Sequence, residues 1–173
     1  MSERGYIVLE TGETYVGQFW GGKDSVGEVV FNTSHSGYEE MATDPSYYSQ
    51  IIVLTAPQQG NYGADKACWE SDNIWIDGFV CLEMQLPLTP NSWQKQLLDH
   101  KVPILSDVDT RKLTLLLRES GTPWGALVQG DSPQQAQSKA KELIQQKKKM
   151  AKDWVHIVSR KEQQIYPGER PGG

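Results

Sequence analysis

The order of strand-like and helix-like segments most limits what this 173-residue chain can fold into. Short apolar stretches separated by Gly, Asp and Ser are typical of β-strands. They fill the first half, at residues 6–9, 14–20, 26–32, 51–55 and 74–84. The run at 51–55 (IIVLT) is continuously apolar, which indicates a strand buried on both faces. The second half alternates helix and strand, so we predict an α/β domain with a strand-rich first half and helices on one side.

Three helices are predicted from residues that can cap them. A side-chain oxygen that accepts from the free N–H groups of the first turn is expected at Thr89, Asp109 and Ser132. Proline follows Thr89 and Ser132 at the first helical position, and Gly121 is expected to end the second helix. A strand at 124–130 separates the last two helices. The third helix has one apolar face, made of Ala136, Ala140, Leu143 and Ile144.

Charge and hydropathy exclude several partners. The net charge of −5 gives no overall attraction for nucleic acid or anionic lipid. The lysine run at 145–150 (QQKKKM) follows an amphipathic helix and has no interleaved aromatics, so we interpret it as a solvated helix end. No apolar run approaches a membrane span, and the N-terminal residues lack the apolar core of a signal peptide. We therefore expect a cytoplasmic protein that binds neither nucleic acid nor membrane.

The familiar catalytic motifs are absent from the sequence. There is no P-loop, no GxGxxG, no HExxH and no paired CxxC. Cys81 lies within the strand-like FVCLE, away from the sharp turn before a helix that activates a thiolate, and is expected to be a buried structural residue. Cys68 lies in a loop without a nearby base. We predict no catalytic residue, no metal site and no cofactor in this chain.

The three histidines, His35, His100 and His156, are far apart in the sequence. We interpret them as surface or loop residues. One alternative is a free-standing hydrolase that uses His35 with Asp44 or Glu40. That function requires a nucleophile or a metal, and the sequence offers neither in an evident form.

Residues 37–50, GYEEMATDPSYYSQ, combine turn residues with three tyrosines. One interpretation is a capped turn, in which Asp44 accepts from backbone N–H groups and Pro45 fixes φ. The other is a binding loop that presents hydroxyl and backbone groups to a polar ligand. The residues alone leave both interpretations open.

Two long segments resemble a known family. Residues 27–63 read GEVVFNTSHSGYEEMATDPSYYSQIIVLTAPQQGNYG, and residues 107–121 read DVDTRKLTLLLRESG. Glu70-Ser71 follows GNYG at the family's usual distance. From about residue 6 to about residue 130, the chain resembles the N-terminal domain of the small subunit of carbamoyl phosphate synthase. The motifs are specific because both occur in the family's order and spacing.

The resemblance implies a three-layer β/β/α domain of the swivelling type. We expect this domain to cover residues 1–152. The tail ends in YPGERPGG, whose composition is that of a linker. Residues 153–173 are therefore expected to lead toward an amidotransferase domain that is absent from this chain.

The resemblance also implies an activity for the whole complex. In the family, an amidotransferase domain with a Cys-His-Glu triad, normally on the same chain, releases ammonia from L-glutamine. The ammonia is channelled to the large subunit, which uses ATP and Mg to make carbamoyl phosphate from bicarbonate for pyrimidine and arginine biosynthesis. This chain lacks the triad, so we expect it to be inactive alone. We expect it to dock on the large subunit and to help close the glutamine site.

One residue is assigned to glutamine by the resemblance. The serine of the TDPSY motif reaches toward the bound glutamine in the family, and this position is Ser46. A hydroxyl both donates and accepts, which suits an amino acid zwitterion. The supporting loop is expected to comprise Gly37, Tyr38, Asp44 and Pro45. The alternative function is a stand-alone adaptor or ligand-binding module that has kept this fold.

Overall fold

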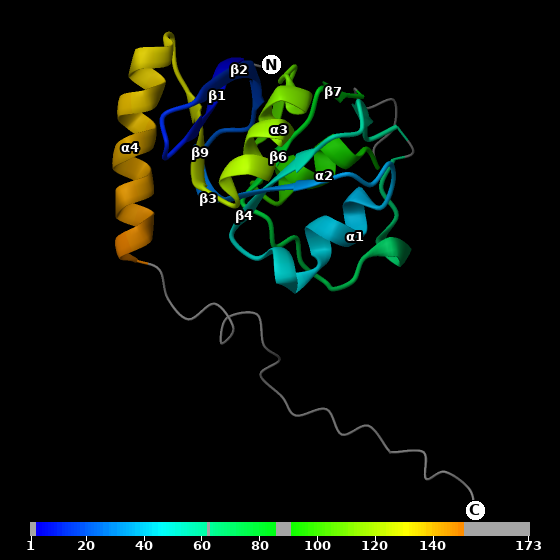
Figure 1. The fold of residues 1–173 in the computed structure, drawn as a ribbon. Helices are drawn as coiled ribbons and strands as arrows, with labels where there is room; N and C mark the ends of the chain where they lie inside the picture. Colours follow the sequence, from blue (N-terminus) through cyan, green and yellow to red (C-terminus); the bar gives the residue numbers. More distant parts are fainter. Residues whose placement is uncertain (1–2, 62, 86–90, 151–173) are drawn as a thin grey trace, which may run out of the picture.

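The computed structural model describes residues 3–61, 63–85 and 91–150 (Figure 1). The predicted linker at 153–173, with His156, lies outside these residues, as do Thr89 and Pro90. The seven main strands are β1 (Glu3–Leu9), β2 (Thr14–Trp20), β3 (Ser25–Asn32), β4 (Gln50–Leu54), β6 (Gly78–Val80), β8 (Ile104–Ser106) and β9 (Trp124–Gln129). The helices are α1 (Tyr38–Thr43), α2 (Trp93–Asp99), α3 (Thr110–Ser120) and α4 (Pro133–Lys149). Two single-turn 3₁₀ helices, η1 (Pro45–Tyr47) and η2 (Lys66–Cys68), complete the helical segments described.

The seven strands form one closed barrel in the order β1-β2-β8-β6-β4-β3-β9. The hairpin β1–β2 is antiparallel, and β9 is antiparallel to both β1 and β3. The strands β3, β4, β6 and β8 run parallel to one another. A small parallel pair, β5 (Gln58–Gln59) with β7 (Glu83–Met84), lies outside the barrel sheet. The predicted α/β class and strand-rich first half are confirmed.

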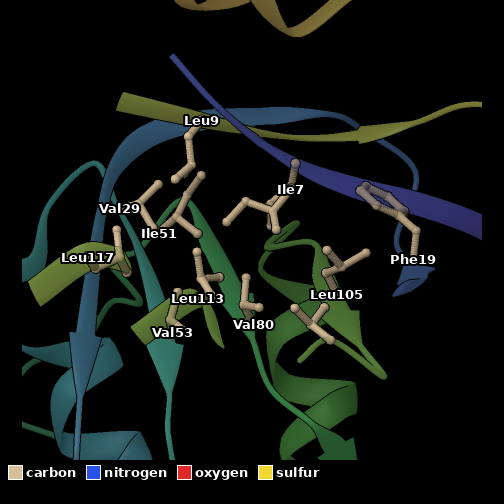
Figure 2. Packing of buried hydrophobic residues seen from close by; sticks show 12 residues of the cluster. Ile7, Leu9, Phe19, Val29, Ile51, Val53, Val80, Leu105, Leu113 and Leu117 are labelled. Atoms are coloured by element: carbon tan, nitrogen blue, oxygen red, sulfur yellow. The ribbon is translucent and has the colours of Figure 1, made fainter. Parts of the chain in front are cut away.

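The strand β4 shows why the barrel has apolar residues on both of its faces. Ile51 and Val53 belong to the cluster inside the barrel, where Leu113 of α3 also packs (Figure 2). Ile52 and Leu54 belong to a second cluster, with residues of α1 and α2. Alternate residues of a strand point to opposite faces, so a strand covered on both sides must be apolar throughout. The prediction from the run at 51–55 is confirmed.

The helices lie on more than one side of the barrel, so the prediction of helices on one side is wrong. Ala136, Ala140 and Ile144 of α4 pack against apolar residues of β1, β3 and β9. The helices α1 and α2 instead cover β4, β6 and β8. In Figure 1, α4 and α1 accordingly lie on different sides of the strands. A closed sheet turns its outer face in several directions, so its apolar parts on β1, β3 and β9 and on β4, β6 and β8 are covered by different helices.

Local capping signals were read correctly where the structure describes them. The Asp109 side chain accepts from Lys112 N at 3.0 Å, and the Ser132 side chain accepts from Gln135 N at 3.3 Å. Gly121, with a φ of 79°, ends α3. The cap of α2 is Ser92, whose Oγ accepts from Lys95 N, and the helix begins later than predicted. Among the described residues, no helix is long and apolar enough to cross a membrane.

Candidate functional site

The predicted glutamine residue, Ser46, lies in an exposed turn between α1 and β4. Asp44 precedes η1 and its Oδ1 accepts from Ser46 N at 2.8 Å, while Pro45 occupies the first position of the turn. Within the described part of the chain, the Ser46 hydroxyl makes no hydrogen bond. The interpretation as a capped turn is confirmed, and the binding-loop interpretation stays a prediction, to which the exposed hydroxyl is relevant.

The helix α1 holds this turn and was not predicted. Gly37 lies directly before it in the left-handed conformation, with a φ of 81°. Tyr38 is 1% exposed, and its ring centroid lies 5.2 Å from that of Trp93. Its hydroxyl donates to Gly63 O at 2.7 Å. Gly37 and Tyr38 were predicted to support the loop, and the structure places them at the start of the helix that leads to Asp44.

Thr43, immediately before Asp44, joins the loop to the Glu70-Ser71 segment. Its buried Oγ1 accepts from Glu70 N at 2.9 Å, and its carbonyl accepts from Ser71 Oγ at 2.7 Å. Ser71 Oγ also accepts from Trp75 Nε1 at 2.8 Å. Two motifs almost thirty residues apart therefore meet behind the candidate loop. Our sequence reasoning missed Thr43, although its place directly before DPSY was a usable signal.

Glu39 is a second residue that the sequence reasoning missed. The residue is 2% exposed, and its carboxylate accepts from Asp65 N at 2.7 Å and from Trp69 Nε1 at 3.3 Å. Burial raises the pKa of Glu39, and the two hydrogen bonds oppose this effect without cancelling it. Together with Thr43, Glu39 joins α1 to the segment 63–77 by hydrogen bonds. These bonds hold the end of α1 from which the Ser46 turn continues.

The contribution of Glu39 to the free energy of unfolding is expected to fall as the pH rises. The folded-state pKa lies above the unfolded value, so the folded chain binds more protons between the two values. The free energy of unfolding of wild type, relative to that of Glu39→Gln, is therefore highest below about pH 4.3, the unfolded value. This difference falls as the pH rises through the folded pKa. Urea denaturation of both chains from pH 4 to pH 8 measures this difference.

Glu39→Ala is the matched control for that experiment. It removes the acceptor of two hydrogen bonds as well as the charge, and is expected to be about 1 kcal/mol less stable than Glu39→Gln at every pH, because neither variant titrates at this position. If the difference between wild type and Glu39→Gln were independent of pH, Glu39 would not titrate as its burial indicates.

The hydrolase alternative finds no assembled site. His35 is exposed, and no hydrogen bond or ion pair joins it to Asp44 or Glu40 in the described chain. Cys81 is fully buried, and this burial raises the pKa of its thiol well above the usual range. Cys68 is exposed at the end of η2. Across the described ranges, no three His, Cys, Asp or Glu side chains group together as a metal site would require.

The fold and site define a class of domain, a closed α/β barrel that presents a capped serine turn beside a short helix. Residues 7–127 match the family model described as carbamoyl-phosphate synthase small chain, CPSase domain. The chain belongs to the carbamoyl phosphate synthase small-chain family, and the predicted resemblance is confirmed.

Curated relatives named carbamoyl phosphate synthase small chain are similar over most of this sequence. The protein from Salmonella typhimurium is 44% identical over 140 residues, covering 77% of this chain and 36% of the relative. That from Escherichia coli K12 is 42% identical over 143 residues, covering 79% of this chain and 37% of the relative. That from Xanthomonas campestris is 41% identical over 138 residues, covering 76% of this chain and 36% of the relative. The chain thus spans little more than a third of the length of these relatives.

Proposed function

We propose that this chain acts as the N-terminal domain of the small subunit of a glutamine-dependent carbamoyl phosphate synthase in the cytoplasm. The domain covers residues 1–152, and residues 153–173 lead to an amidotransferase domain that carries the Cys-His-Glu triad. The chain docks on the large subunit, where ATP and Mg are used. The assembled complex makes carbamoyl phosphate for pyrimidine and arginine biosynthesis, and this chain alone has no glutaminase activity. Membership of the family supports the proposal.

A finer proposal concerns the fold. We infer that the barrel is a variant of the three-layer β/β/α swivelling-type domain, in which opposite walls of the barrel supply the two β layers. The helix packed against β1, β3 and β9, or those against β4, β6 and β8, would form the α layer. A closed sheet leaves no unpaired edge strand, which suits a domain that must remain rigid while it contacts two other units.

The geometry of Ser46 is the one structural observation that supports its assignment to glutamine, which the family resemblance supplied. Its backbone is fixed by Asp44, and its hydroxyl is exposed without a partner in the described chain. A hydroxyl held in this way can accept from an ammonium group or donate to a carboxylate at little entropic cost. Within the complex, it would close one side of the glutamine site.

Ser46→Ala in the complete small subunit, assembled with its large subunit, tests this assignment. Losing a hydrogen bond to a charged group is expected to raise the KM for glutamine about tenfold. Synthesis driven by added ammonia should not change, because ammonia bypasses the glutamine site. Ser34→Ala, at another exposed serine, is the control. It should change neither the KM for glutamine nor ammonia-driven synthesis. An unchanged KM for glutamine in Ser46→Ala would remove Ser46 from the site.

Co-elution with the large subunit of the same organism tests docking. The chain alone and a complete small subunit are applied separately to a sizing column with the large subunit. Co-elution of both supports a docking role for this domain. If the complete small subunit also failed to co-elute, the stand-alone adaptor or ligand-binding module would become the better function.

A further inference from the structure

Asp77 connects the last turn of α4 to the segment that carries Ser46. Its Oδ2 accepts from Ser49 Oγ at 3.0 Å and from Lys147 Nζ at 3.1 Å. Asp77 N donates to Gln50 O at 2.8 Å, which places this carboxylate directly beside the start of β4. Three segments far apart in the sequence therefore meet at one oxygen atom.

Ser49 is held firmly, three residues after Ser46. It is 1% exposed, and its backbone has a positive φ of 61°, which is unusual for serine. Its N–H donates to Trp75 O at 3.2 Å. A residue in this conformation persists only where its surroundings fix it. The Asp77 side chain is one of those surroundings, so its position bears on the C-terminal end of the Ser46 turn.

Lys147 differs from the other ion-paired lysines of α4. Among the ion pairs of the described residues, Lys139 pairs with Asp24 and Lys148 pairs with Glu10, both outside the Ser46 segment. Lys147 alone of these three reaches the carboxylate that holds Ser49. The remaining contacts of α4 go to the barrel: an apolar face packs on β1, β3 and β9, and Gln137 donates to Gly12 O and Thr14 Oγ1.

Solvent reaches the contact that joins Lys147, Asp77 and Ser49, which we call the tie. Two hollows of about 330 and 470 Å³ both include Asp77 and Ser25 among their lining residues. The side chains of Lys147 and Asp77 are 35% and 31% exposed, so the pair is partly screened. Such a contact is strong enough to bias the position of a loop and weak enough to be released.

We propose that Lys147 and Asp77 are positioning residues for Ser46, which they couple to the C-terminal turn of α4. The inference rests on the proposed role of Ser46 in the glutamine site. Residues 151–173 follow α4 in the sequence. A change in the position of the last turn of α4 would therefore alter the ion pair between Lys147 and Asp77, and through Asp77 the position of Ser49. In the complex, the tie would make glutamine affinity depend on how α4 is held.

Amide hydrogen exchange in the 173-residue chain tests the tie without any need for glutamine. Lys147→Met is compared with Lys148→Met, the neighbouring substitution on the same helix. Both remove one cation and one ion pair, and Met and Lys have similar helix propensities. Exchange at Tyr48 and Ser49 is expected to quicken about three- to tenfold in Lys147→Met only. The inference would be overturned if Tyr48 and Ser49 exchanged at the same rate in the two variants. It would also be overturned if they exchanged no faster in Lys147→Met than in wild type.

The KM for glutamine in the assembled enzyme provides the functional readout. Lys147→Met is expected to raise the KM for glutamine about threefold without changing ammonia-driven synthesis. Lys147→Arg keeps the charge, so its KM for glutamine should equal that of wild type. If Ser46→Ala raised the KM and Lys147→Met did not, the coupling would be wrong. If Ser46→Ala itself had no effect, the proposed glutamine role of Ser46 would fail. The exchange experiment would then still decide whether the tie exists.

Discussion

Replacing Trp93 with alanine is expected to lower the free energy of unfolding by about 3–5 kcal/mol. Trp93 is the first residue of α2 and is fully buried between this helix, α1 and the barrel wall. Its ring centroid lies 5.2 Å from that of Tyr38 and 6.0 Å from that of Phe79. Alanine would leave a cavity that three separate elements border, and such a cavity collapses only in part.

Urea denaturation of the 173-residue chain measures this loss, and Trp93→Phe is the matched control. Trp93 Nε1 is buried without a hydrogen-bond partner among the described residues, so phenylalanine gives up no bond there. We expect Trp93→Phe to cost less than about 2 kcal/mol. A loss below 1 kcal/mol for Trp93→Ala would mean that α1 and α2 do not share one core with the barrel wall.

Gly27→Ala is expected to destabilise the chain by about 3 kcal/mol and to displace Ser49. A Cβ atom at Gly27 would lie 2.5 Å from Ser49 O and 3.2 Å from Ser49 C. These are backbone atoms, and β3 cannot move away easily because it is hydrogen-bonded to β4 and β9. The strain therefore falls on the segment that carries the candidate loop.

Gly22→Ala is the control for this prediction. A Cβ atom at Gly22 would meet nothing within 4 Å, and Gly22 does not have a positive φ. Its effect on the free energy of unfolding should stay within about 0.5 kcal/mol. The measurements are urea denaturation of both variants and the backbone amide chemical shift of Ser49. Equal stability of the two variants would show that the close approach of β3 to Ser49 relaxes at little cost.

The sequence predicted the candidate turn better than the residues around it. Asp44, Pro45 and Ser46 are adjacent, and a side chain that caps its own turn leaves a local signal. The contacts that Glu39 and Thr43 make with the segment 65–71 leave no local signal, because those partners lie 26 or more residues away. The role of Ser46 toward glutamine comes from the family resemblance and stays a prediction.

The helix α1 shows why some local structure escapes sequence reasoning. It has only six residues and lies in a stretch rich in turn formers. Isolated helices of this length are not stable in water, so its formation depends on tertiary packing. Tyr38 provides that packing through its ring contact with Trp93, more than fifty residues away, and through its hydrogen bond to Gly63 O.

The sequence by itself determined the strand-rich first half, the caps at Asp109 and Ser132, and the family. These depend on residues close together in the chain or on motifs in a fixed order. The tertiary structure decided the closure of the barrel, which requires the distant pairings β2–β8 and β3–β9. It also decided the placement of helices on several sides and the meeting of Ser49, Asp77 and Lys147. Contacts between distant segments form only when the whole core assembles, and no local pattern of residues records them.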